Sequence, residues 1–215
     1  MTELDHITVA AHTLAQGLAY LRDALGIDLP AGGAHPRMAT HNHLLRLGDS
    51  VFLELIAIDP AAPAPLRPRW FQLDDPGLQA ELAVTPRLLT WVVRPRDIAE
   101  TFLASHTPLG ALEPMQRGDL RWLISFPNDG ALPQGGMIPS LIRWPPHAPH
   151  PATRMADLGA SLERFEAVHP DPAGYRQDLA SIGADRLVEI RQAPAGARPH
   201  LIAHLRTPSG LRVLR

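Results

Sequence analysis

The apolar and polar positions of the chain repeat one pattern three times, a short apolar strand followed by an amphipathic helix. In the first copy, leucines recur every three or four residues between Leu14 and Leu25, so that one face of the helix is apolar. A repeat of this length predicts a fold assembled from similar units. The strand and helix pairs are expected at Leu4–Val9 with Thr13–Leu25, Leu88–Val93 with Asp97–Ala104, and Leu162–Val168 with Ala173–Ile182.

The rest of the first unit is predicted from its turn residues and apolar runs. Ile27–Leu29 is expected to be a short edge strand, and Pro30–Arg37, rich in glycine and proline, is expected to be a loop. His43–Leu47 and Val51–Ile58 are strand candidates, joined by a hairpin turn at residues 48–50. The unit therefore has the order β-α-β-β-β.

The two later units continue in a similar way. The second is expected to end with strands at Leu120–Phe126 and Met137–Ile142. The third is expected to continue with strands at Arg186–Arg191, His200–Arg206 and Leu211–Leu214. Together these patterns predict an α+β fold made from repeated β-α-β-β-β modules.

A segment rich in proline and alanine, Asp59–Pro68, separates the first two units and is expected to be an extended linker. A short helix is expected at Gly77–Ala83. Between them, Trp70 and Phe71 either cap a binding cavity or pin the linker by packing, and we favour packing. The expected modules, within one compact domain, are residues 1–59, a linker at 60–84, residues 85–146 and residues 147–215.

Composition narrows the classes of function. The net charge is −2 and all 20 basic residues are arginines without a concentrated basic block, which argues against a nucleic-acid partner. There is no cysteine, so disulfides and thiolate chemistry are not available. The N-terminus lacks the pattern of a signal peptide, and no apolar run approaches ~18 residues, so we expect a cytoplasmic protein without a membrane partner.

Two polar residues occur at the centres of apolar strands in the first unit. His6 is expected to point to one face of the first strand, with Asp5 and Ile7 on the other face. Glu54 lies inside the apolar run Val51–Ile56. A carboxylate buried there must be paired, protonated or bound to a metal, whereas on a one-sided sheet it points to solvent. A histidine beside a carboxylate is a common acid–base arrangement.

The order of these motifs resembles a known family. Leu4–Ile7 at the start and Phe52–Leu55 at the end of a β-α-β-β-β module resemble the vicinal oxygen chelate superfamily, which includes glyoxalase I, extradiol dioxygenases and bleomycin-resistance proteins. Gly32–Pro36, Thr40–Asn42 and Leu53–Ala57 resemble, more narrowly, the glyoxalase-like domain proteins. The resemblance extends over nearly the whole chain. It implies an open, mostly antiparallel half-barrel with helices outside and a ligand or metal in the cup.

The resemblance also implies where a metal would bind. In metal-dependent relatives each module contributes histidine or glutamate ligands from its first and last strands. Here the first module offers His6 and Glu54, whereas the aligned positions of the second module are Thr90 and Ser140. Hydroxyl groups are poor ligands for transition metals, so we expect at most a partial, weakly held site for Zn, Ni, Mn or Fe.

The remaining site candidates surround this pair. Asn42, Thr90 and Ser140 are expected to hydrogen-bond a substrate, Trp122 to form an aromatic wall, with Trp91 a second wall candidate on the alternate strand face, and His150 to lie at the rim. The spacing of His41 and His43 is compatible with a metal, but exposed histidines are the simpler interpretation.

Two functions remain open. One is an enzyme of lyase, isomerase or dioxygenase type that acts on a small oxygenated or carbonyl compound, with His6 and Glu54 as general base or metal ligands. The other is a protein of the bleomycin-resistance type that binds and sequesters a small molecule. Either would act as a monomer or a homodimer.

Overall fold

Strand β1 (Thr2–Ala10) lies at the centre of an eight-stranded sheet in the computed structural model, which describes residues 1–215. It pairs in parallel with β4 (Phe52–Ile58), the last strand of its own module. Its other edge pairs antiparallel with β5 (Arg87–Pro95), the first strand of the second module. The two modules are therefore joined through their first strands into one continuous sheet.

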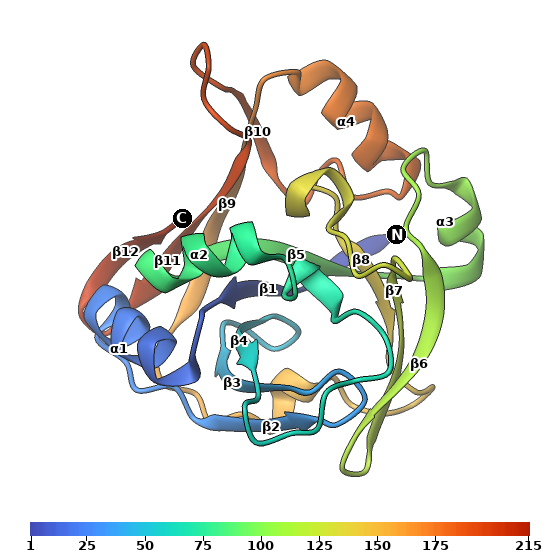
Figure 1. The fold of residues 1–215 in the computed structure, drawn as a ribbon. Helices are drawn as coiled ribbons and strands as arrows, with labels where there is room; N and C mark the ends of the chain where they lie inside the picture. Colours follow the sequence, from blue (N-terminus) through green and yellow to red (C-terminus); the bar gives the residue numbers. More distant parts are fainter.

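The sheet has the order β2-β3-β4-β1-β5-β8-β7-β6 and curves into a cup (Figure 1). It confirms the expected α+β fold of modules that form a half-barrel. We use "cup" for its concave face. The remaining strands are β2 (Ala31–His35), β3 (Thr40–Arg46), β6 (Ala111–Arg117), β7 (Leu120–Phe126) and β8 (Ser140–Arg143).

The helices begin and end where the sequence supplies capping groups. Helix α1 (Leu14–Leu25) begins after Thr13, whose side chain accepts a hydrogen bond from a backbone N–H, and it ends at Gly26 in the left-handed conformation. Aspartates play the same N-terminal role in the other three helices. These are α2 (Pro76–Val84), α3 (Ile98–Ala104) and α4 (Pro172–Ser181).

A second, four-stranded sheet has the order β10-β9-β11-β12. It has the expected element order, but its pairing differs from that of the first module. There β1 pairs with the last strand, whereas here β9 pairs in parallel with β10, directly after α4, and antiparallel with β11. The strands are β9 (Ser161–His169), β10 (Glu189–Gln192), β11 (His200–Thr207) and β12 (Gly210–Leu214).

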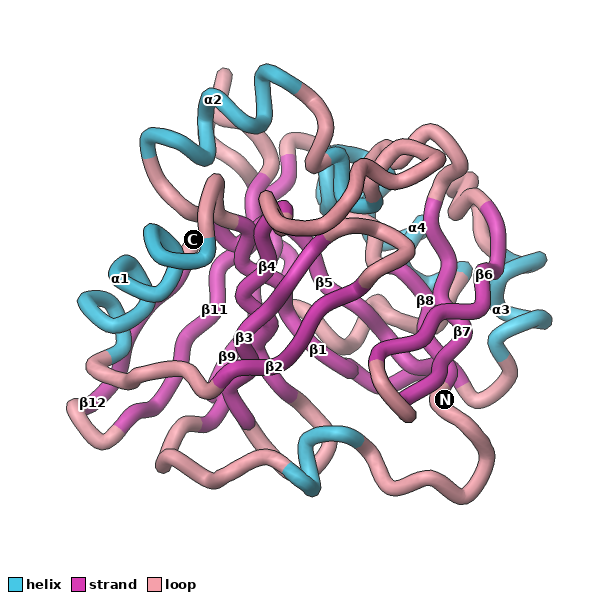
Figure 2. Tube along the Cα trace, turned by 60° about the horizontal axis from the view of Figure 1, so that its bottom comes forward, coloured by secondary structure: helices cyan, strands magenta, loops and turns pink.

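Two apolar cores lie on opposite faces of the first sheet. The larger core, of 31 buried residues, fills the convex face and contains Trp91 of β5 together with Phe165 and Tyr175 of the second sheet and α4. The smaller core, of 16 buried residues, lies in the cup. Figure 2 shows the second sheet and α1 beside the curved first sheet. The second sheet thus covers the convex face, and the cup is left for a ligand.

The segment between the modules fills one end of the cup. We call residues 70–84 the plug; it comprises the short 3₁₀ helix Trp70–Gln72 and α2. Its buried side chains Trp70, Phe71 and Leu78 belong to the core of the cup. Phe71 has φ of 58°, a left-handed conformation that is unusual for a bulky residue. The plug therefore limits how much of the cup remains open.

One edge of the sheet differs from expectation. Ile27–Leu29 forms no strand, and the edge strand is Ala31–His35, which the glycine and proline content had indicated as a loop. Glycine is required here because β2 approaches the side chain of Asn42 closely. A Cβ on Gly32 would lie 2.2 Å from Asn42 Oδ1. The glycines thus mark a close approach of backbone to a buried polar group.

No helix of the structure combines the length and the apolar character needed to span a membrane.

The link between α4 and the first sheet generates a stability prediction. The Tyr175 hydroxyl donates a buried hydrogen bond of 2.8 Å to the backbone carbonyl of Met137, which also accepts one from Trp91 Nε1. Tyr175→Phe is expected to lower the free energy of unfolding by about 1 kcal/mol, since one buried hydrogen bond is lost. Urea denaturation measures this. Tyr20→Phe, in which no such bond is broken, is the matched control and is expected to change little; equal effects of the two substitutions would contradict the prediction.

Candidate functional site

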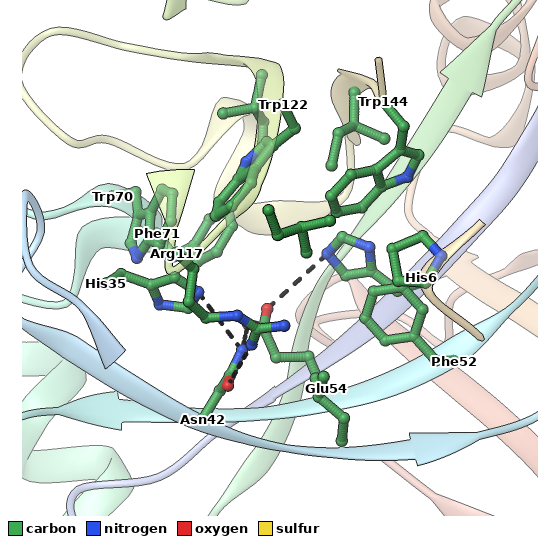
Figure 3. A pocket seen from close by; sticks show the side chains of 15 residues that line it. His6, His35, Asn42, Phe52, Glu54, Trp70, Phe71, Arg117, Trp122 and Trp144 are labelled. Carbon is green, nitrogen blue, oxygen red and sulfur yellow. Dashed lines mark hydrogen bonds and ion pairs between the residues drawn. The ribbon is translucent and has the colours of Figure 1, made fainter. Parts of the chain in front are cut away.

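A small pocket lies in the cup beside the plug (Figure 3). The space open to the centres of water molecules is about 40 Å³, room for about three waters. The pocket is lined by 15 residues from the first module, the plug, the second module and the segment after β8. They are His6, His35, Asn42, Leu44, Phe52, Glu54, Trp70, Phe71, Arg117, Leu120, Trp122, Ile124, Ile142, Trp144 and Pro151.

The predicted pair His6 and Glu54 projects into this pocket from two adjacent strands. His6 is 5% exposed and Glu54 is 6% exposed, so both are buried polar groups. His6 Nε2 lies 3.8 Å from Glu54 Oε2, and Figure 3 shows the two side chains directed toward one another. The imidazole ring stacks on Phe52, with ring centroids 4.5 Å apart. The solvent-facing alternative for Glu54 is therefore wrong.

Asp5 also belongs to this site, contrary to the expectation that it points away from His6. The pairing of β1 with β5 is interrupted between Leu4 and His6, which leaves Asp5 as the unpaired residue of a β-bulge. A bulge re-aims the side chain that it carries. Asp5 Oδ1 lies 2.8 Å from His6 Nδ1 as a result. Strict alternation along the strand had excluded this contact.

The Asp5 carboxylate is completely buried and collects four polar contacts. Besides His6, Asp5 Oδ2 accepts hydrogen bonds from Arg94 Nη1 at 2.8 Å and Trp144 Nε1 at 2.9 Å, and lies 3.1 Å from His150 Nε2. Burial alone would raise the pKa of Asp5, but the hydrogen bonds from His150 and His6 outweigh it and hold that pKa well below its usual range. The carboxylate is therefore ionised.

Asn42 holds the other carboxylate. Its Nδ2 donates to Glu54 Oε1 at 2.6 Å, and its Oδ1 accepts from the Gly33 backbone N–H at 2.9 Å and from Arg117 Nη1 at 2.8 Å. These bonds fix the orientation of the Asn42 amide. Beside it, burial lowers the pKa of His35 to about 4, although the Glu54 carboxylate opposes the shift. His35 is thus neutral at pH 7.

The other sequence-predicted residues lie at varying distances from the pocket. Trp122 lines it. His150 contacts Asp5 behind His6 and does not line the pocket itself. Thr90 and Ser140 are buried but are not among the lining residues. Substrate binding by the last three residues stays a prediction.

In both modules the first strand pairs with the last strand in the same register, so Ser140 does correspond to Glu54. Thr8 lies opposite Glu54 in the first module, and Val92 lies opposite Ser140 in the second. The pseudosymmetric half of the site therefore carries no imidazole or carboxylate.

His41, His43 and Trp91, which the sequence also offered as site candidates, do not line the pocket. Asn42 lines the pocket, so the alternate residues His41 and His43 point to the opposite face of β3. His43 Nδ1 lies 2.8 Å from the Leu29 carbonyl oxygen. Trp91 belongs to the core of the convex face.

Sequence reasoning missed several residues of the site. Asp5, His35 and Arg117 were not assigned to it, because they reach it through a bulge, an unpredicted edge strand and a hairpin end, respectively. Trp144 follows directly after β8 and was indicated only as part of the segment before the rim candidate His150. Trp70 and Phe71 both pack and line the pocket, so the two interpretations of them are compatible.

The residues present do not form a complete metal site. No group of three or more histidine, cysteine, aspartate or glutamate side chains is arranged so that it could hold a metal ion. Asp5 at His6 Nδ1 leaves Nε2 free, an arrangement that metal-bound histidines often show. Glu54 is the only carboxylate that faces Nε2. Two protein ligands do not fit a tightly held divalent ion, which normally has three or four.

Comparisons with solved structures agree with the fold. A hypothetical protein from Staphylococcus aureus superposes with a TM-score of 0.59 at 14% identity, and the alignment covers 85% of this chain and 75% of that chain. Methylmalonyl-CoA epimerase from Mycobacterium tuberculosis gives a TM-score of 0.43 at 19% identity, over 67% of this chain and 89% of that one. At this identity the first likeness shows the fold alone, and the second is too distant to carry an argument. No curated protein matches the chain.

The sequence model of a family described as "Glyoxalase-like domain" matches residues 4–183. This range includes both modules of the eight-stranded sheet, the plug and the beginning of the second sheet. It confirms the resemblance that the motifs around His6, Asn42 and Glu54 indicated. The chain belongs to the glyoxalase-like domain family.

Proposed function

We propose that this protein is an enzyme that moves a proton within a small oxygenated or carbonyl compound, in an isomerase or lyase type of reaction. The observation that carries the proposal is the pair of His6 Nε2 and Glu54 Oε2, 3.8 Å apart in a buried pocket, each with a separate partner that holds it. Two proton-accepting groups on one small cavity suit the removal of a proton and its return at another atom.

The contacts of the pair define the role of each residue. Asp5 accepts the Nδ1–H of His6, which selects the tautomer with a free lone pair at Nε2. Asn42 fixes Glu54 through Oε1 and leaves Oε2 toward the pocket. A substrate C–H or O–H placed beside Nε2 and Oε2 can thus lose its proton to one group. That proton can return at another substrate atom, either directly or after transfer to the second group.

A second candidate function is binding without reaction. The pocket is rich in aromatic side chains, among them Phe52, Trp70 and Trp122, and such linings hold apolar ligands without chemistry. Under this alternative His6 and Glu54 would only hydrogen-bond the ligand. The two functions differ in whether the bound compound exchanges protons with solvent.

Deuterium exchange distinguishes them. The protein is incubated in D₂O with small compounds that carry a C–H next to a carbonyl, such as pyruvate and hydroxyacetone, and exchange is followed by proton NMR. We expect accelerated exchange for at least one compound, and a loss of about 10²- to 10⁴-fold in His6→Ala and in Glu54→Gln, because each removes one proton-transfer group. His43→Asn, on the opposite face of β3, is the control. Binding with no exchange of any compound would favour sequestration.

The role of Asp5 predicts a pH-dependent loss of stability. Asp5→Asn is expected to lower the free energy of unfolding by about 3 kcal/mol, because Arg94 is left without its buried partner. Glu3→Gln removes the exposed partner of the same guanidinium and is expected to cost under about 1 kcal/mol. The pKa of Asp5 is depressed in the folded protein. Its contribution is therefore present above the ordinary aspartate pKa of about 3.9 and is lost as the pH falls through the folded-state value. Denaturation between pH 2 and pH 7 measures both variants, and an effect of Asp5→Asn that does not shrink toward the acid end of this range would contradict this.

Chelation tests the remaining metal expectation. Since the protein supplies two ligands, we expect dialysis against EDTA to leave proton exchange unchanged within about twofold. Elemental analysis of the dialysed protein is the control for complete removal. A loss of exchange that stoichiometric Zn, Ni, Mn or Fe restores would show that the partial site of His6 and Glu54 holds a functional metal.

A further inference from the structure

The arginines around the cup differ in how their charges are paired. Arg37 lies 2.7 Å from a carboxylate oxygen of Glu113, and Arg67 lies 3.2 Å from the other oxygen of that residue. Arg94 is paired with Asp5. Arg117 lines the pocket but has no carboxylate within salt-bridge distance. Its one hydrogen bond, from Nη1, goes to the neutral amide oxygen of Asn42.

Arg117 is therefore a partly buried cation whose donors are largely unused. A guanidinium carries five N–H donors in a planar fork. Burial lowers the pKa of Arg117, and the more distant Glu54 carboxylate only partly offsets that effect. The guanidinium stays charged, as arginine does in proteins. A buried charge without a contacting partner is costly, and an anion bound beside it would repay that cost.

The surroundings of Arg117 leave room for its side chain and open toward solvent. A Cβ on Gly33 would lie 2.9 Å from Arg117 Cδ, so glycine at this position gives the side chain its space. Arg117 also lines a second, outer pocket of about 350 Å³, which shares Leu44, Leu120 and Pro151 with the inner one. The guanidinium thus lies where the inner and outer pockets meet. Figure 3 shows it beside Asn42.

We propose that Arg117 binds the carboxylate of a small 2-oxo or 2-hydroxy acid whose reacting carbon lies toward His6 and Glu54. The proposal rests on the proton-transfer function above and names its substrate class. A carboxylate matches the planar fork of a guanidinium in two parallel hydrogen bonds. In a 2-oxo acid the proton leaves the carbon next to the carbonyl, and in a 2-hydroxy acid it leaves C2, which lies next to the carboxylate. In both cases the proton is later returned, so atoms and electrons balance without an oxidant.

The size of the inner pocket and the charge of Glu54 restrict which acids can bind. An inner space for about three waters suits a compound of a few carbon atoms. The Glu54 carboxylate is close enough to Arg117 to interact electrostatically with the guanidinium. A dianion such as a phosphate ester would bring two negative charges toward that carboxylate, whereas a monocarboxylate brings one. A single carboxylate is therefore the anion that this site suits best.

The test compares acids with their amides, which differ in charge but hardly in shape. Pyruvate, pyruvamide, lactate and lactamide are titrated into the protein, and binding is followed by isothermal titration calorimetry and tryptophan fluorescence. We expect at least one acid to bind about tenfold or more tightly than its amide. Arg117→Gln is expected to remove this preference, and Arg117→Lys to retain part of it, because lysine keeps the charge but not the fork.

The control removes the same charge from the same hairpin. Arg121 is exposed on β7 and does not line the inner pocket, so Arg121→Gln is expected to leave the preference unchanged. Thermal melts show whether each variant is folded. If Arg117→Gln does not fold, Arg117→Lys still tests the proposal. Equal affinity for acids and amides in the natural protein, binding of none of these acids, or an unchanged preference in both Arg117 variants would overturn the proposal.

The outcome separates this inference from the proposed function. If an acid binds through Arg117 but shows no deuterium exchange, the substrate class survives and proton transfer fails. If hydroxyacetone exchanges through His6 and Glu54 while acids have no advantage, proton transfer survives and the carboxylate inference fails.

Discussion

The buried carboxylate of Asp5 is the interaction on which the arrangement of the site depends. An ionised group with no exposure to water is tolerable only when it is fully hydrogen-bonded, and its partners are then held in place as strictly as it is. Asp5 gathers His6 from its own strand, Arg94 from β5, and Trp144 and His150 from the segment after β8. One side chain thus ties together both modules of the sheet and the connection to the third. The position of His6 in the pocket is a consequence of that junction.

The two open edges of the sheet are linked by polar contacts across the mouth of the cup. β2 and β6 are the edge strands, and open edges of this kind need to be covered. Here Arg37, just after β2, reaches Glu113 and the Pro114 carbonyl of β6, and Arg117 at the end of β6 reaches Asn42 of β3. These contacts nearly close the barrel, although β2 and β6 do not pair with each other.

Much of the fold could be predicted because it is encoded locally. Caps such as Thr13 and Asp97 and the spacing of leucines fixed the helices, and the apolar runs located the central strands. His6 and Glu54 could be paired because they lie on neighbouring strands of a repeat. Asp5 could not be placed, because a bulge depends on how two strands pair rather than on either sequence alone. The strand at residues 31–35 was missed for a similar reason. Gly32 is needed because the strand approaches the side chain of Asn42, and that contact cannot be read from the local sequence.

The plug has a consequence for how this protein could acquire new ligands. The groups that support chemistry reside on the sheet, whereas much of the space beside them is set by a connecting segment that belongs to neither repeat. Shorter side chains at Trp70 or Phe71 would enlarge the chamber and leave the register of every strand intact. Selection for bulkier compounds can therefore act on a loop that contributes nothing to the hydrogen-bond ladder of the sheet. Reactivity and ligand size are in this way determined by separate segments of the chain, which can change independently.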